Sequence, residues 1–127
     1  MANIHPCYVL VDIQRMVADG NWEFANELAE KNYETYCWTE EKMIRFISCL
    51  RAPGQAGNGD FHKVFSAQSI YKGTNRVDAD AYKIEFDEEN LARGNALDCC
   101  FYIKLAILSD EDGSYVGVTS FHLDTYR

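Results

Sequence analysis

The chain has 127 residues, 47% hydrophobic and 25% charged, a composition that suits one globular domain with one core. Its net charge of −8 argues against a general nucleic-acid-binding protein, whose surface is usually basic. No apolar stretch approaches the roughly 20 residues that span a membrane, and the N-terminus lacks a secretory signal pattern, so we expect a cytoplasmic protein with no membrane partner.

The N-terminal part of the chain predicts three helices. Apolar residues recur at helical spacing over 8–19, 22–32 and 40–51, and we expect a helix in each range. Asn21 and Thr39 are suited to cap the second and the third helix. The third helix is expected to end before Pro53, because the residue before a proline avoids helical geometry.

After a glycine-rich loop over 52–60, the pattern changes to the alternation that indicates strands. The first strand is predicted to place Phe61, Lys63 and Phe65 on one side and His62, Val64 and Ser66 on the other. Residues 73–75 resemble a turn, 81–86 alternate again, and 87–96 suit a short helix or an excursion. Helices followed by strands predict an α+β fold: one domain over 1–127, with N-terminal helices packed on a C-terminal antiparallel β-sheet.

The stretch from Asp98 to Leu123 carries the strongest hairpin signal, because two β-rich flanks enclose an acidic loop that ends in Asp112-Gly113. Its odd positions are mostly apolar and are predicted to face the core: Phe101, Ile103, Leu105, Ile107, Tyr115, Thr119, Phe121 and Leu123. Its even positions are predicted to face away: Tyr102, Lys104, Ser120 and His122. If Leu108 pairs with Ser114, Tyr102 lies opposite Ser120. His122 is then the diagonal neighbour of Tyr102, at about 7 Å.

Charges and cysteines restrict the possible chemistry further. From Phe61 to Val77 the chain has basic residues and no acid, which suggests a local cationic patch on an acidic protein. The five cysteines contain no Cys-x-x-Cys, so we expect neither a zinc site nor a disulfide framework. Cys99 and Cys100 are adjacent in a predicted strand and should point to opposite faces.

Five short motifs occur in the order and approximate spacing of a known family. They are His5-Pro6-Cys7-Tyr8-Val9-Leu10, Asp60-Phe61-His62-Lys63, Asp80-Ala81-Tyr82, Tyr102-Ile103-Lys104 and Ser120-Phe121-His122. On these motifs the chain resembles the MqsR family of toxins, messenger-RNA interferases of bacterial toxin–antitoxin pairs, over most of residues 4–123. The resemblance implies a RelE-like fold, sequence-selective cleavage of single-stranded mRNA, and a cognate antitoxin that covers or clamps the toxin.

The chain also departs from that family. Asp78-Ala79 stands where the family has Trp-Gln, so a glutamine assigned to the active site is missing, and His122 replaces the last functional lysine. At the strand after the glycine-rich loop, the family has Phe-Tyr-Lys-Ser-Met, and this chain has Phe61-His62-Lys63-Val64-Phe65. The loop before Asp60 and the stretch 83–97 resemble insertions. The family is basic, whereas this chain is acidic.

RNA can be cut without a metal or another cofactor, because its own 2′-OH can attack the next phosphate. An enzyme then supplies a base, positive charge and an acid. The catalytic candidates are Lys63 for charge or as a base, Tyr102 for a hydrogen bond to the phosphate or nucleotide, and His122 as acid or base. His62, Arg76 and Lys104 are candidates for RNA binding through flanking phosphates.

Each candidate also has a structural explanation: Tyr102 as a half-buried strand residue, Lys104 as a solvated lysine, and His122 as a surface histidine. The alternative function is a non-catalytic interaction or inhibitor protein on the same fold, phage-type or a nucleic-acid mimic, whose acidic faces bind a basic partner. One predicted helical region contains Glu23, Glu27, Glu30 and Glu34. These acids suit either a basic antitoxin segment or a solvated surface.

Overall fold

The computed structural model describes residues 5–54, 57–70, 76–94 and 100–124. In chain order, its elements are α1 (Leu10–Ala18), β1 (Trp22–Phe24), α2 (Glu27–Thr35), α3 (Glu40–Ser48), β2 (Phe61–Ser69), β3 (Arg76–Asp87), β4 (Ala92–Arg93), β5 (Cys100–Asp110) and β6 (Gly113–Leu123). The three helices precede the long strands, which confirms the predicted α+β class. None of these helices is long and apolar enough to cross a membrane.

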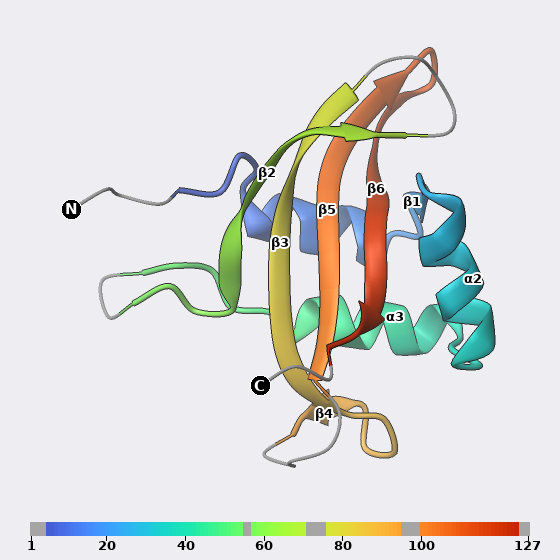
Figure 1. Ribbon diagram of the computed structural model, residues 1–127, viewed down its shortest axis with the longest axis vertical. Helices are drawn as coiled ribbons and strands as arrows, with labels where there is room; N and C mark the ends of the chain where they lie inside the picture. Colours follow the sequence, from blue (N-terminus) through green and yellow to red (C-terminus); the bar gives the residue numbers. More distant parts are fainter. Residues whose placement is uncertain (1–4, 55–56, 71–75, 95–99, 125–127) are drawn as a thin grey trace.

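The strands form one mixed sheet in the order β1-β6-β5-β3-β2, with β4 added to β3. The long strands pair antiparallel, whereas β1 pairs parallel to β6, so the prediction of a wholly antiparallel sheet was wrong. Strand β5 lies in the middle, between β6 and β3, as expected for the hairpin. In Figure 1 the helices lie behind the long strands, and no described helix covers the face of the sheet that is turned to the reader. We call that surface the open face.

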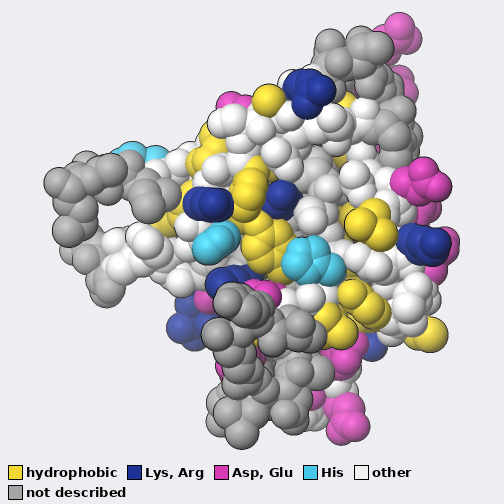
Figure 2. All heavy atoms as spheres, viewed as in Figure 1, with side chains coloured by type: hydrophobic (Ala, Val, Ile, Leu, Met, Phe, Trp, Pro, Cys, Tyr) yellow, Lys and Arg dark blue, Asp and Glu magenta, His cyan; other side chains and the backbone are white. Residues whose placement is uncertain are grey.

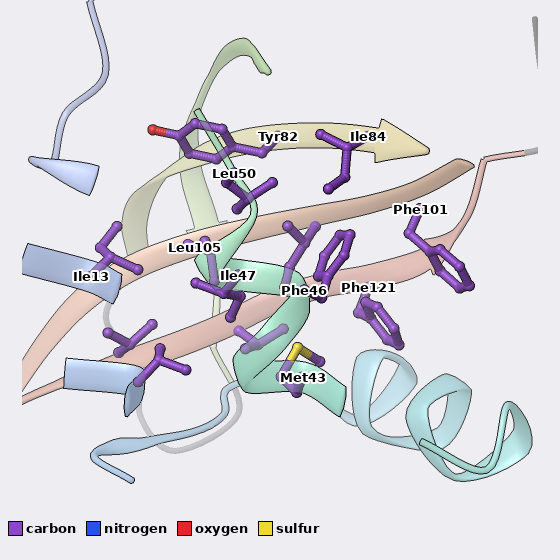
Figure 3. Close-up of a cluster of buried hydrophobic side chains, with 14 of the residues drawn as sticks. Ile13, Met43, Phe46, Ile47, Leu50, Tyr82, Ile84, Phe101, Leu105 and Phe121 are labelled. Carbon is purple, nitrogen blue, oxygen red and sulfur yellow. The ribbon is translucent and has the colours of Figure 1, made fainter. Parts of the chain in front are cut away.

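The main core lies between the sheet and the helices (Figure 3). Phe101 and Phe121 stack across β5 and β6 with ring centroids 5.9 Å apart and planes 7° apart. Trp38 contacts both of these rings and also Phe46 of α3. Phe101, Ile103 and Phe121 are each at most 1% exposed. The predicted apolar parity of β5 is therefore confirmed.

The second helix begins later than predicted. Its N-cap is Asn26, whose side chain accepts a hydrogen bond from the Ala29 N–H at 3.1 Å. Residues 22–24 form β1 instead, because pairing with β6 and packing of Phe24 against Tyr33 outweigh the local helical spacing. Thr39 caps α3 as predicted, accepting from the Lys42 N–H at 3.2 Å. Helices α1 and α3 are shorter than the predicted ranges.

The register of the β5–β6 hairpin also differs from the prediction. The turn is tight: Asp110 pairs with Gly113, and the Asp110 carboxylate accepts from the Asp112 N–H at 2.8 Å. A second shift follows between Lys104 and Leu105, where Thr119 is the extra residue in β6. Together these features place His122 directly opposite Tyr102, where Ser120 was expected.

The same bulge reverses the side-chain parity within β6. Val116 and Val118 belong to the main core together with Phe121. Tyr115 packs instead against the separate cluster of Ala106 and Leu108, so its predicted place on the core face was wrong. Thr119 lies at the bulge and its hydroxyl donates to the Lys104 carbonyl at 3.4 Å, which also departs from the simple alternation.

A bulge in β2 corrects the predicted alternation there. Phe61 pairs with Tyr82 but Lys63 pairs with Ala81, so His62 is the extra residue. Phe61 is buried in the main core, and Lys63 and Phe65 do not share its side of the strand. The predicted turn at 73–75 lies outside the described residues. The expected short helix or excursion begins as a turn held by the Asp87 carboxylate, which accepts from the N–H groups of Glu89 and Asn90, and the turn is followed by β4.

Candidate functional site

Aromatic and basic side chains from four strands gather on the open face. They form what we call the open-face cluster: His62, Lys63, Phe65, Lys83, Tyr102, Lys104 and His122. Figure 2 shows this face, with hydrophobic side chains at its centre between lysines and histidines. This surface is basic although the whole chain carries a net charge of −8.

Small residues in β3 make room for the cluster. Ala81 pairs with Lys63 on one side and with Lys104 on the other, and Ala79 pairs with Phe65. Both alanines are fully buried. Because these two alanines have small side chains, the longer side chains of β2 and β5 pack over this part of β3 and contact one another.

Tyr102 lies at the centre of the cluster. Its ring stacks on His122 with centroids 4.8 Å apart and planes 16° apart. His62 and Phe65 approach the Tyr102 ring edge-on, with centroids at 6.1 Å and 6.4 Å. Three rings from two other strands thus surround one tyrosine, an arrangement that favours stacking with unpaired bases.

Two lysines lie over the ring of Phe65. The Lys104 ammonium is 3.7 Å from the ring centroid and the Lys63 ammonium 4.7 Å from it, both within the range of cation–π attraction. Lys104 also donates a hydrogen bond to the Gln68 side-chain oxygen at 3.1 Å. The ring and the amide hold two positive charges close together, although their mutual repulsion opposes this arrangement.

These contacts change the protonation of the cluster. Burial, and after it the positive charge of Lys63, lower the pKa of Lys104 from its ordinary value. Burial also lowers the pKa of His62, and the charges of Lys83 and Lys63 add to this effect while Asp124 opposes it. Burial, with the nearby charge of Asp124, raises the pKa of Tyr102 to about 12. Tyr102 therefore keeps its proton at neutral pH and can donate a hydrogen bond.

The imidazole of His122 has a defined orientation. Its Nδ1 lies 2.9 Å from the Leu123 carbonyl oxygen. A carbonyl oxygen can only accept, so Nδ1 carries a proton and donates it, and Nε2 is the nitrogen left for a ligand. At the edge of the cluster, Lys83 forms an ion pair with Asp124 at 3.5 Å.

The structure brings together most of the residues singled out in the sequence. Lys63, Tyr102 and His122 share the cluster, as do His62 and Lys104. Arg76 is not in contact with them. It pairs with Ser69 at the other end of β2 and β3, and its guanidinium donates to the Ala67 carbonyl at 3.2 Å.

Two members of the open-face cluster, Phe65 and Lys83, and the residue that accepts from Lys104, Gln68, were not predicted. The alternation of β2 already placed Phe65 with Lys63, so its role could have been read from that pattern. Lys83 lies on the open face because it pairs with Tyr102 between β3 and β5. Gln68 reaches Lys104 because the register of β2 shifts after Phe65. Neither contact has a local sequence signal.

The described residues contain no group of three or more His, Cys, Asp or Glu side chains placed to hold a metal ion. Cys7, Cys37 and Cys49 have free thiols. No family model, curated protein or solved structure matches the chain. The open-face cluster combines rings that can stack on bases, lysines that can bind phosphates, and histidines that can transfer protons.

Proposed function

We propose that the protein is an MqsR-like toxin with a RelE-like fold that binds single-stranded mRNA on its open face and cuts it without a metal. The observation that carries the proposal is the Tyr102–His122 stack, with centroids at 4.8 Å, beside Lys63 and Lys104 over the Phe65 ring. Stacking surfaces and positive charge together are what a flexible single strand requires. A titratable imidazole adds proton transfer to that surface.

The proposal divides the chemistry among the residues of the open-face cluster. Lys63 and Lys104 stabilise the negative charge that develops on the phosphorane, His122 transfers a proton, and Tyr102 positions the nucleotide or donates to the phosphate. His62 contacts the RNA next to Tyr102. The reacting 2′-OH comes from the substrate, so the reaction needs no cofactor.

Contacts between the family-like motifs support the proposal. The carboxylate of Asp80 is fully buried and accepts hydrogen bonds from the backbone N–H groups of Cys7 and Tyr8 at 2.8 and 2.9 Å. The Tyr8 hydroxyl donates to the Asp78 carbonyl at 2.7 Å. Two motifs that lie more than 70 residues apart in the sequence are thus in direct contact, as related segments of one fold would be.

Helix α2 is the surface that best fits a basic antitoxin. Glu27, Glu30 and Glu34 are exposed along it, and Leu28 among them is 64% exposed. Glu23 lies in β1, so the acidic helical region is shorter than the sequence suggested. The same surface favours the second candidate function, a non-catalytic protein that binds a basic partner.

The test is cleavage of a long single-stranded RNA by purified protein in the presence of EDTA. We expect wild type to cleave and the chelator to leave the rate unchanged. Lys63→Ala and His122→Ala should each lower the rate about 10²-fold or more. His5→Ala is the matched control, because His5 is exposed and lies outside the open-face cluster.

A second test is induction of the protein in a bacterial host. Growth arrest and transcript cleavage would support the toxin assignment if co-expression of the neighbouring gene relieved both effects. Absence of RNA cleavage by wild type on every transcript tested would favour the binding-protein function. Cleavage that neither substitution affects would remove this site.

A further inference from the structure

Two histidines from different strands lie on the two sides of the central tyrosine. His62 comes from the bulge in β2 and His122 from the end of β6. Their ring centroids are 6.1 Å and 4.8 Å from that of Tyr102. The bulge at His62 lets His62 and Lys63 share the open face although Phe61 is buried, and the bulge at Thr119 turns His122 to that face although Val116 and Val118 point into the core.

We propose that His62 and His122 act as a pair in RNA cleavage, His62 as the general base and His122 as the general acid, with Tyr102 between them. The assignment rests on the proposed ribonuclease function and deepens it, since it changes His62 from an RNA contact to a catalytic group. Lysines 63 and 104 then supply charge and transfer no proton.

The surroundings of His62 suit a base. Lys63 and Lys83 lie near it, and their charges oppose a further positive charge on the imidazole. Partial burial is the largest cause that lowers the pKa of His62, the charges of Lys83 and Lys63 add to it, and the charge of Asp124 opposes it. The lowered pKa favours the neutral ring, whose lone pair can accept a proton.

The contacts of His122 suit an acid. The Leu123 carbonyl accepts from Nδ1 at 2.9 Å and fixes the ring. With Nδ1–H held by this carbonyl, a proton on Nε2 points away from the backbone and can be donated to a substrate. Stacking on Tyr102 limits the rotation of the ring and keeps Nε2 in one direction.

The reaction balances without any other participant. His62 takes the proton of the 2′-OH, the 2′ oxygen forms a bond to phosphorus, and the bond from phosphorus to the 5′ oxygen breaks. The leaving 5′ oxygen takes the proton from Nε2 of His122. The products are a 2′,3′-cyclic phosphate and a 5′-hydroxyl, and proton exchange with water restores both histidines.

The test compares two substrates of equal sequence, ordinary RNA and RNA with sulfur in place of the bridging 5′ oxygen at the cleaved bond. A thiolate leaves without being protonated, so the sulfur substrate needs no general acid. His122→Gln should lose about 10²-fold on ordinary RNA and regain nearly the wild-type rate on the sulfur substrate. His62→Gln should lose about 10²-fold on both substrates. His5→Gln should match wild type, and circular dichroism checks that all variants are folded.

The pH dependence gives an independent readout. The groups that face the two imidazoles are Lys63, Lys83, Tyr102 and Asp124. Wild type should show a bell-shaped profile of kcat/KM, because one histidine must be neutral and the other charged. His62→Gln should lose the limb that rises with pH, and His122→Gln the limb that falls.

The outcomes separate this assignment from the proposed function. If wild type cleaves RNA but His62→Gln keeps its rate, or is rescued by sulfur, the base assignment is wrong and the ribonuclease proposal stands. Failure of sulfur to rescue His122→Gln would overturn the acid assignment in the same way. If wild type cleaves neither substrate, both proposals are wrong.

Discussion

The two faces of the sheet use the same strands for opposite purposes. On the covered face, Phe101 and Phe121 stack with centroids at 5.9 Å and are each 1% exposed. One residue along on both strands, Tyr102 and His122 stack at 4.8 Å on the open face and remain partly exposed. A stacked cross-strand pair is thus a core element on one side and an accessible surface on the other.

The difference lies in what covers each pair. Trp38 and Phe46 close over the phenylalanines and exclude water, so burial there stabilises the fold. The residues around the Tyr102–His122 pair are His62, Phe65 and three lysines. The lysines remain in contact with water and carry positive charge. Covered rings should therefore govern the stability of the protein, and uncovered rings its ligand binding.

The largest expected effect is on the covered face. Phe101→Ala should lower the free energy of unfolding by about 3–5 kcal/mol, because it removes a buried ring from a packed aromatic cluster. The matched variant is Tyr102→Ala on the same strand, which should cost about 1 kcal/mol because that side chain is partly exposed. Urea unfolding of both variants measures the contrast. Equal losses would show that the two faces do not differ in this way.

A smaller loss of unfolding free energy is expected when Asp80 is substituted. Its fully buried carboxylate accepts from the backbone of the N-terminal segment and holds that segment on β3. Asp80→Ala should cost about 2–3 kcal/mol, since two backbone N–H groups lose a charged acceptor. Asp80→Asn keeps one acceptor oxygen and should cost less. The unfolding free energies and the hydrogen-exchange rates of the Cys7 and Tyr8 amides check this. Unchanged exchange in Asp80→Ala would mean that the carboxylate does not hold the segment.

Asp80 also predicts a change of stability with pH. Burial raises the pKa of Asp80 above its ordinary value of 3.8, more than the hydrogen bonds from Cys7 and Tyr8 lower it. The native state therefore binds a proton more readily than the unfolded state does, so this contribution is lost as pH rises and regained as pH falls. Wild type should gain stability relative to Asp80→Asn between pH 7 and pH 4. A constant difference across that range would contradict the shift.

The smallest expected effect is a shift in protonation on the open face. Burial and the charge of Lys63 lower the pKa of Lys104, so Lys63→Gln should raise it without restoring the ordinary value. Lys42→Gln is the control, because Lys42 lies over Trp38 near Glu88, away from the open-face cluster. A titration followed by NMR at the Lys104 side chain measures the change. Equal titration in all three proteins would mean that the two lysines are not coupled.

The parts of the fold that could be predicted depend on local periodicity. Phe101, Ile103 and Phe121 alternate with polar residues, and a sheet with one buried face sorts them as expected. The cap at Thr39 has a local hydrogen bond to Lys42, so sequence spacing alone reveals it. Asn21 and Asn26 are both suitable caps, and only the pairing of β1 with β6 decides between them.

The candidate site was less predictable, because bulges have no clear signal within a single strand. The extra residues at His62 and Thr119 depend on the partner strand, and they decide which side chains meet Tyr102. The basic run between Phe61 and Val77 suggested that Lys63 and Arg76 act together, but the length of β2 and β3 separates them. The contacts of Lys104 with Phe65 and Gln68 arise from tertiary structure alone.

Binding of single-stranded RNA to the open face can be measured directly. A short RNA with 2′-O-methyl groups cannot be cut through its 2′-OH, so its binding to wild type can be followed by NMR at equilibrium. We expect chemical-shift changes at His62, Lys63, Phe65, Tyr102, Lys104 and His122, weakened by salt. None is expected at Val9 or Leu28, which are exposed at α1 and α2, the helices that lie behind the long strands in Figure 1. Changes centred on α1 or α2, or no changes at millimolar RNA, would contradict the claim.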